Sequence, residues 1–371
     1  MSLQFVNTTG RPAAWALGFQ ADGRERLTVI AKSTYRMPLA GEQVELGVEQ
    51  QPLIEADRFT GEPGLSAPVL ETDFAHTKPR CDVIVVGHAT APAGQAVQHL
   101  TVGLRVGTLL KQLQVSGRRH WRSSLLGWHA SEPEAFQRLP LSYDLAYGGT
   151  DRTHEAEGRT RTFEANPVGM GHWPDRQDLA GLPLPCLEPV GEHLSSPLGQ
   201  VAPVSLSPVG RNWLPRRRLA GTYDEHWVTH TAPLWPADFD EAYFQCAPPD
   251  QQMPFPVGGE PVVLQHLSAE GRRAFHLPVA PLPVTFVPHQ GRALVQQAVI
   301  DTIVLEPDAQ RFTLTYRSTL ALGRSFFDVK EIVVGELSRA QLRRRQFPGK
   351  RHYPSLAEAV AELGRARRRG P

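Results

Sequence analysis

The stretch AVIDTIVLEPDAQRFTLTYRST, residues 298–319, decides the fold class of the chain. In its second half, Phe312, Leu314 and Tyr316 alternate with arginine and threonine, which is the pattern of a strand with one buried face. The Glu-Pro-Asp sequence at 306–308, between the two apolar halves, is typical of a turn. This stretch therefore predicts an antiparallel hairpin, and with it a fold built on β-sheets.

Similar patterns occur in the first third of the chain. Residues 26–37 carry apolar side chains at alternate positions, and residues 81–89 form a short valine-rich run. Residues 100–115 contain two alternating runs around a Gly-Thr pair, which predicts a second antiparallel hairpin. Together these segments predict a mainly β (α+β) fold, in which antiparallel sheets form a sandwich- or barrel-like core.

The region from about 140 to 259 has a different character. Many of the 33 prolines and 32 glycines fall here, and hydrophobic periodicity disappears. A structureless loop of that size inside a compact domain is improbable. We therefore expect this irregular Pro/Gly-rich region to be ordered by its own aromatics, prolines and buried backbone hydrogen bonds, or by a partner. Short helices should interrupt it, for example around 238–246.

The C-terminus predicts a short helix. Ser355 and Glu358 have the spacing of a capping box, and an apolar stripe follows them. The arginine-rich runs at 343–345 and 365–369 are interpreted as a solvated face or helix end. The predicted organisation is a β-rich domain over 1–335, with the irregular insertion inside it, and a basic helical tail over 336–371. The two β-rich ends are compatible with one domain or with two.

Composition excludes several classes of protein. Among 371 residues, 39 Lys and Arg balance 38 Asp and Glu, which gives no electrostatic case for binding nucleic acid or an anionic membrane. Cys81, Cys186 and Cys246 form no CxxC pair, which argues against a zinc ribbon or a disulfide scaffold. No secretory signal and no run of about 20 apolar residues is present. We therefore expect a cytoplasmic protein.

Local motifs of common enzymes and cofactor sites are missing from the sequence. There is no GxxxxGK[ST] phosphate loop and no GxSxG nucleophile elbow. The glycine pairs at 169–171 and 258–259 lack the strand and helix of a dinucleotide site, so tight turns are the better interpretation. We expect no cofactor, and no local motif requires an enzyme.

One cluster has the composition of a metal or catalytic site: GTYDEHWVTHTAPLWPADFD, residues 221–240. His226 and His230 are four residues apart, as in zinc hydrolases, and Asp224 and Asp238 could complete the ligand set. However, no general-base glutamate follows the first histidine. The β-branched residues between the histidines, and the proline soon after, also disfavour a helix. A metal-assisted hydrolase centred on these four residues is the alternative hypothesis.

The same residues have structural interpretations. Thr222 and Asp224 are placed to cap a turn, and Asp238 to cap the short helix that follows. Trp227 and Trp235 could pin an irregular loop while their indole N–H groups bond a carbonyl.

A set of short motifs then runs almost end to end along the chain. They are Lys32 and Thr34, Gln51-Pro52, Glu71 to Ala75, Lys78-Pro79, Cys81 to Val83, Gly87 to Ala89, Val115 to Trp121, Pro140 to Tyr143, Ala146 to Gly149, Asp151, Asn166 to Gly169, Trp213 to Arg216, Gly221 to Asp224, Trp227, Pro236 to Asp240 and Ala247 to Gln252. Each motif alone is weak, but their order is specific. In this order the chain resembles a bacterial domain-of-unknown-function family, number twenty-one sixty-nine.

The resemblance implies an adaptor or chaperone of type VI secretion and no catalysis. Such a protein binds an effector toxin in the cytoplasm. The effector is often fused to, or encoded beside, a PAAR-type spike tip, and the adaptor helps to load it onto the VgrG trimer. The implied partners are therefore the cognate effector, the PAAR-type tip and VgrG.

The side-chain types that usually carry interface energy are Tyr, Trp and Arg. The candidate protein-binding residues are Trp121, Trp173, Trp213, Arg216, Tyr223 and Trp227. For any single aromatic residue the competing interpretation is an anchor buried inside the protein. A further alternative is a carbohydrate-binding β-module that uses exposed tryptophans.

Overall fold

The structure is a computed structural model that describes residues 3–39, 41–125, 127–214, 216–323, 325–338, 341–342 and 360. Strands dominate over helices and most of them pair antiparallel, so the predicted mainly β fold is confirmed. The predicted C-terminal helix and the basic run at 343–345 lie outside the described residues, apart from Val360. None of the described helices is long and apolar enough to cross a lipid bilayer.

The chain divides into two compact units. The small unit comprises Met1–Gly10, Leu282–Gln297 and Phe327–Pro371, and the large unit comprises Arg11–Pro281 and Ala298–Phe326. In the described part of the small unit, one sheet has the order β1 (Gln4–Asn7), β27 (Val329–Val334), β23 (Pro283–Pro288) and β24 (Leu294–Gln297). Val284, Phe286 and Ile332 are among its buried side chains.

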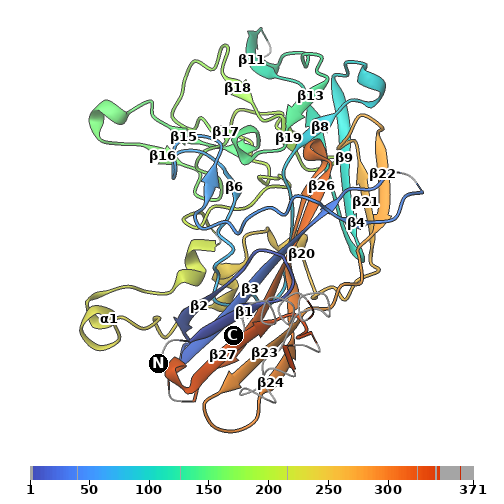
Figure 1. The fold of residues 1–371 in the computed structure, drawn as a ribbon. Helices are drawn as coiled ribbons and strands as arrows, with labels where there is room; N and C mark the ends of the chain where they lie inside the picture. The colour runs from blue at the N-terminus through green and yellow to red at the C-terminus, as the bar shows by residue number, and fades with distance from the viewer. Residues whose placement is uncertain are drawn as a thin grey trace, which may run out of the picture. The chain divides into compact units, whose positions relative to one another are not determined.

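The main sheet of the large unit contains the hairpin of 298–319. Its order is β2 (Ala13–Phe19), β3 (Glu25–Arg36), β26 (Arg311–Ala321), β25 (Val299–Glu306), β7 (Cys81–Val85) and β20 (Gln252–Met253), with β4 (Glu45–Leu46) beside β3. β25 and β26 pair antiparallel around the 3₁₀ turn η7 (Pro307–Ala309), which confirms the predicted hairpin. β3 and β26 run side by side over their whole length (Figure 1). β7 joins β25 in parallel.

A second sheet contains the other predicted hairpin. Its order is β19 (Leu187–Glu188), β10 (Leu109–Ser116), β9 (His99–Val106), β21 (Pro261–Gln265) and β22 (Arg272–His276). β9 and β10 pair antiparallel, and Gly107 between them has φ 58°, a left-handed conformation that glycine adopts without strain. The hairpin predicted at 100–115 is therefore confirmed.

The region 140–259 is ordered mostly without regular structure. Short strands inside and outside this region pair in small groups: β5 (Arg58–Phe59) with β6 (Pro68–Leu70), β8 (His88–Thr90) with β13 (Arg138–Pro140), β11 (Arg119–Ser124) with β12 (Gly127–Ala130) and β18 (Pro183–Leu184), β14 (Tyr147–Gly148) with β17 (Met170–Gly171), and β15 (Thr150–Asp151) with β16 (Arg161–Thr162). The helices of the region are α1 (Glu225–His230) and the 3₁₀ turns η2 (Tyr143–Leu145), η3 (Glu155–Glu157), η4 (Arg216–Ala220), η5 (Glu241–Phe244) and η6 (Pro249–Gln251), while η1 (Pro92–Gly94) and η8 (Phe326–Asp328) lie outside it. η5 confirms the short helix predicted around 238–246.

Aromatic and aliphatic side chains hold this region together, as its composition predicted. Trp121, Tyr147 and Leu184 belong to one buried cluster, and the partly buried Phe163 and Trp173 pack against it. The packing replaces the regular hydrogen-bond ladders that the segment lacks.

A buried carboxylate on β7 ties the region to the main sheet. Asp82 accepts hydrogen bonds from Lys78 Nζ at 2.7 Å, Gln245 Nε2 at 2.6 Å and the main-chain N–H groups of Cys246 and Ala247 at 2.8 and 3.2 Å. Burial lowers the pKa of Lys78, but Asp82, Cys246 and Asp301 together raise it more, so the net shift is upward. Moving the loop that carries Gln245 away from the strand would leave the buried Asp82 carboxylate without these donors, so the contacts hold the loop against β7.

Candidate functional site

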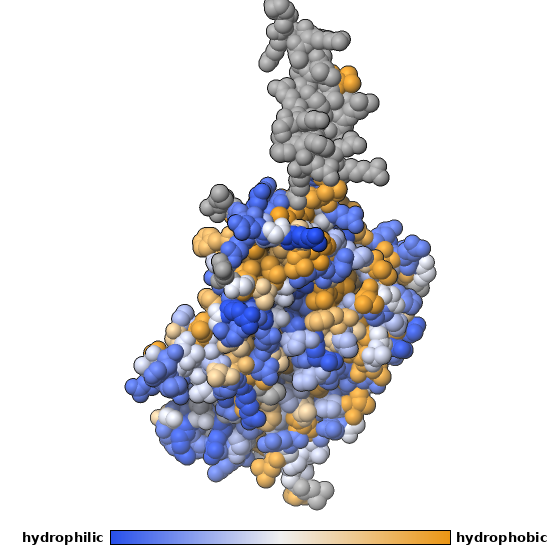
Figure 2. All heavy atoms as spheres, turned by 90° about the horizontal axis from the view of Figure 1, so that it is seen from below, coloured by the Kyte–Doolittle hydropathy of each residue, from blue (hydrophilic) through white to orange (hydrophobic). Residues whose placement is uncertain are grey.

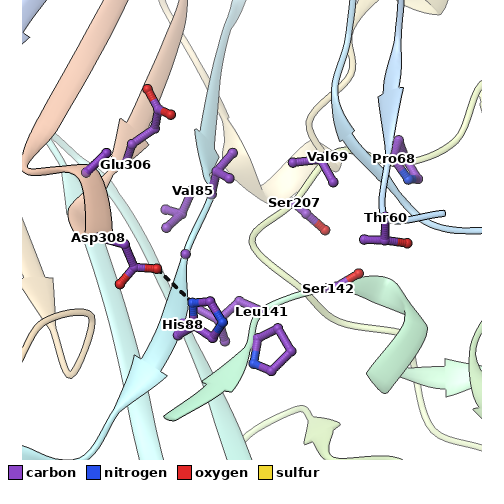
Figure 3. A pocket seen from close by; sticks show the side chains of 14 residues that line it. Thr60, Pro68, Val69, Val85, His88, Leu141, Ser142, Ser207, Glu306 and Asp308 are labelled. Atoms are coloured by element: carbon purple, nitrogen blue, oxygen red, sulfur yellow. Dashed lines mark hydrogen bonds and ion pairs between the residues drawn. The ribbon is translucent and has the colours of Figure 1, made fainter.

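A cavity of about 270 Å³ lies at the end of β7 (Figure 3). Its walls come from β6 and the residue after β5, from the end of β7 and the segment that leads into β8, from the end of β13 and from η7. We call it the β7 pocket. Its floor is apolar and includes Val69, Val85 and Leu141. The hairpin turn at 306–308 thus supplies one wall of a pocket as well as a connection between strands.

His88 and Asp308 form the polar rim of the β7 pocket. His88 Nδ1 lies 2.7 Å from Asp308 Oδ2, and Arg138 Nη2 lies 2.8 Å from Asp308 Oδ1. Arg138 Nη2 is also 3.2 Å from His88 Nδ1. Because two acceptors would repel each other at 2.7 Å, Nδ1 carries the proton, and its N–H donates a hydrogen bond to Asp308. In the neutral imidazole, Nε2 is then an acceptor.

The second ring nitrogen of His88 points toward the opposite wall of the pocket, on the side of Leu141 and Ser142 (Figure 3). Within the described part of the chain, no residue hydrogen-bonds to His88 Nε2. The pocket therefore presents one unpaired imidazole acceptor above an apolar floor.

The hydroxyl groups on the opposite wall are already occupied. Ser142 Oγ donates to Asp144 Oδ2 at 2.8 Å, and Thr60 Oγ1 donates to the same oxygen at 2.7 Å. Ser142 makes no hydrogen bond to His88. A serine nucleophile needs a hydrogen bond to its base, so His88, Asp308 and Ser142 do not form a hydrolase triad here.

Sequence reasoning missed this site. His88 lies within the Gly87–Ala89 motif and Asp308 lies in the predicted turn, but 220 residues separate the two along the chain. In the sequence, the motif and the turn are two separate local features, and nothing in either one indicates that they meet. β7 pairs in parallel with β25, and this pairing brings the two residues to the same end of the sheet.

The 221–240 cluster forms a helix, contrary to the sequence prediction. Glu225–His230 is α1, and Asp224 caps it by accepting from Trp227 N at 2.8 Å. This cap offsets the lower helix propensity of the β-branched residues. The prediction that Asp238 caps the following helix is also wrong. Asp240 caps η5, accepting from Ala242 N at 2.8 Å.

Asp238 instead closes the loop on Thr222, whose N–H and Oγ1 donate to the two carboxylate oxygens at 2.9 and 2.8 Å. The rings of His226 and His230 stack on one face of α1 with centroids 4.5 Å apart. Among the described residues, no group of three or more His, Cys, Asp or Glu side chains is arranged to hold a metal ion.

The two tryptophans of the cluster pin the loop as predicted. Trp227 Nε1 donates to the Leu234 carbonyl and Trp235 Nε1 to the Phe19 carbonyl, both at 2.9 Å. α1 lies at the end of a loop that extends away from the sheets of the large unit (Figure 1). We call residues 221–240 the α1 lobe.

Three of the six predicted protein-binding residues are inside the protein. Trp121, Trp213 and Arg216 are buried, which agrees with the competing interpretation of internal anchors. Their size and hydrogen-bonding capacity are used to anchor irregular segments. Trp173 is half-buried against the cluster around Trp121.

Tyr223 and Trp227 are the predicted residues that reach the surface together. Tyr223 is 50% exposed, Trp227 is half-buried, and their rings pack edge to face with centroids 4.7 Å apart. Val228 on the same helix is 64% exposed. Hydrophobic residues also lie among hydrophilic ones on the face drawn in Figure 2, which is ordinary for a protein surface. The α1 lobe differs from this ordinary surface because the backbone that carries its exposed apolar side chains is held in place by the Asp224 cap and the Trp227 indole hydrogen bond.

A second cavity, of about 280 Å³, lies within the central region. Tyr143, Leu214, Arg216 and Pro248 are among the residues that line it. Three of the motif stretches that carry the family resemblance therefore meet at one place in the fold.

Comparison with known proteins identifies the family. The family model described as "Uncharacterized protein conserved in bacteria (DUF2169)" matches residues 22–317. No curated protein and no solved structure matches the chain. Since the matched residues make up most of the 371-residue sequence, the chain belongs to this bacterial family.

Proposed function

We propose that this protein is a cytoplasmic adaptor or chaperone for a type VI secretion effector. In this role it binds a PAAR-linked toxin and helps to load it onto the VgrG spike. The observation that carries the proposal is the α1 lobe, an exposed aromatic surface that is already ordered without a partner. The motif resemblance to adaptors of this kind supplies the identity of the partner.

An ordered surface suits an adaptor because binding then costs little conformational entropy. Asp224 caps α1, Asp238 holds Thr222, and the Trp227 indole is tied to the Leu234 carbonyl. These contacts leave Tyr223 and Val228 outward. Aromatic side chains on a rigid support are frequent hot spots of protein–protein interfaces.

The partner is a protein in this proposal. The near-equal numbers of basic and acidic residues give no general attraction to nucleic acid or to anionic lipid. The α1 lobe itself contains Asp224, Glu225, Asp238 and Asp240 and no lysine or arginine, which would repel phosphate backbones.

The test is co-expression with the effector encoded beside this gene. The wild-type chain should co-purify with the effector and raise its solubility. Val228→Asp should lower the recovered complex at least 10-fold, because it places a charge in an apolar interface, while Val48→Asp, the same change at a more exposed valine outside the α1 lobe, should not. If the effector stays soluble, stable and deliverable without this chain, the proposal is wrong.

The carbohydrate-binding alternative would need exposed tryptophans. Trp121 and Trp213 are buried, and Trp173 and Trp227 are half-buried. A glycan array tests this alternative directly, and specific binding that survives Val228→Asp would favour it.

A further inference from the structure

We propose that the β7 pocket holds one apolar side chain of the partner protein, and that His88 Nε2 accepts a hydrogen bond from a main-chain N–H beside that side chain. The inference rests on the proposed function only for the identity of the protein that carries the side chain. It adds a second point of attachment to the α1 lobe.

The size of the pocket admits a single large side chain and lies just below the range of small-molecule sites. Its volume is about 270 Å³, whereas pockets for drug-sized ligands and cofactors span roughly 300–1,000 Å³. Val69, Val85 and Leu141 give it an apolar floor. Filling such a floor with a leucine or phenylalanine side chain removes apolar surface of both partners from water.

The charges around the pocket are paired with one another. Asp308 is held by Arg138 and His88. Glu306 is held by Arg311, with Nε to Oε2 at 2.8 Å and Nη2 to Oε1 at 2.9 Å. A charged ligand would lose its hydration and find no unpaired opposite charge at the rim, so the pocket selects a neutral occupant.

His88 supplies the polar half of the recognition. Its Nδ1–H is committed to Asp308, which leaves Nε2 as an acceptor directed into the pocket (Figure 3). The Ser142 and Thr60 hydroxyls already donate to Asp144. The matching group on the occupant is therefore a donor, and a polypeptide carries one on its main chain next to every side chain except proline.

The first experiment measures the chemistry of the pocket with defined probes. Purified full-length protein is titrated with N-acetyl-L-leucinamide and N-acetyl-L-lysinamide, and binding is followed by saturation-transfer NMR. The two probes share the main-chain N–H groups and differ in the side chain. We expect a Kd on the order of 1 mM for the leucine probe, as its size allows, and at least 10-fold weaker binding of the lysine probe.

Two matched variants test whether the leucine probe binds in the β7 pocket. Ala309 lines the pocket from η7, and Ala156 is an exposed alanine in another 3₁₀ turn, η3. Ala309→Phe fills the pocket and should weaken the leucine probe at least 10-fold, while Ala156→Phe should leave it unchanged. His88→Phe should weaken it several-fold by removing the acceptor. Equal binding to Ala309→Phe and wild type, or no binding of the leucine probe, overturns the proposal. Unchanged binding to His88→Phe overturns its hydrogen-bond part.

The second experiment asks whether the occupant comes from the partner protein. The same two alanine variants are co-expressed with the effector, and circular dichroism checks that both are folded. Ala309→Phe should lower the recovered complex at least 10-fold relative to Ala156→Phe. If wild type and Ala309→Phe recover the effector equally, the pocket is not its docking site although the adaptor function stands. If wild type recovers no effector, the proposed function fails, while the probe titration still decides the chemistry of the pocket.

Discussion

The Arg216 guanidinium lies in a two-pronged contact with the Glu71 carboxylate, and both side chains are almost fully buried. Nη2 donates to Oε2 at 2.8 Å and Nη1 donates to Oε1, with the side chains 5% and 6% exposed. Nε donates to the Tyr243 carbonyl at 2.9 Å, and Nη1 to the Val209 carbonyl at 2.7 Å. One arginine therefore joins a loop near β6 to two segments of the central region, which explains why it is inside the protein.

Arg216→Met should destabilise the protein by about 3–5 kcal/mol, because it leaves the Glu71 carboxylate buried without its main ion-pair partner. Arg211, 3.1 Å away, would be the ion-pair partner that remains. Urea unfolding measures the change. Arg217→Met is the matched control. Its ion pair with Glu164 is 51% exposed on both sides, so its loss should cost less than about 1 kcal/mol. Equal effects of the two variants would contradict a structural role for Arg216.

Gly117→Ala should destabilise the protein by about 3 kcal/mol or more, because a backbone clash in a packed site has no cheap relief. A Cβ at Gly117 would lie 1.7 Å from the Glu134 carbonyl oxygen. Gly323→Ala is the control, since no atom lies within 4 Å of its added Cβ. Thermal melts measure the stability of both variants. A Gly117→Ala protein as stable as Gly323→Ala would contradict the close approach of the backbone at Gly117 and Glu134.

Tyr143 makes stability sensitive to alkaline pH. Burial, reinforced by the charge of Asp250, raises the pKa of Tyr143 above its ordinary value of 10.0. The unfolded tyrosine loses its proton near pH 10 while the folded one keeps it, so the folded state binds more protons there and stability falls as pH rises. At about pH 10.5 the free energy of unfolding is lower by about 0.8 kcal/mol because of this one tyrosine.

Tyr143→Phe should remove that loss. Urea unfolding of both proteins is measured at pH 7.5 and at about pH 10.5. Relative to wild type, the free energy of unfolding of the variant should be about 0.8 kcal/mol higher at the upper pH than at pH 7.5. The measurement at pH 7.5 is the control, because the tyrosine is protonated in both states there. A difference that does not change with pH would show that Tyr143 ionises freely in the folded protein.

The hairpins at 100–115 and 298–319 could be predicted because their causes are local. Alternating side chains select a strand with one buried face, and a Gly-Thr pair or the turn at 306–308 closes it. The helix α1 shows the limit of the same reasoning. Propensity at Val228 and Thr229 argued against it, but the Asp224 cap and the Trp227 indole bond outweigh that preference.

The β7 pocket could not be predicted because its residues meet only through long-range pairing. Its rim joins a residue after β7 to the turn after β25, and these strands lie in parallel. A parallel pair requires a long connection that leaves no periodic trace in the sequence. Burial of Arg216 could not be predicted for a similar reason, since it depends on Glu71, 145 residues away.

The metal-assisted hydrolase alternative makes a prediction that separates it from the adaptor. Asp224 and Asp238 already accept backbone N–H groups, and His226 and His230 stack on each other. A metal bound by these four residues would have to displace those contacts, so added zinc should not stabilise the fold. We expect the melting temperature of the full-length protein to be the same with zinc and with a chelator, and the same for the double variant His226→Ala/His230→Ala. A ligand at 100 times its Kd stabilises the folded state by about 2.7 kcal/mol, which a melt detects easily. A zinc-dependent rise in wild type that disappears in the double variant would therefore establish a metal site in the α1 lobe and reopen the enzymatic hypothesis.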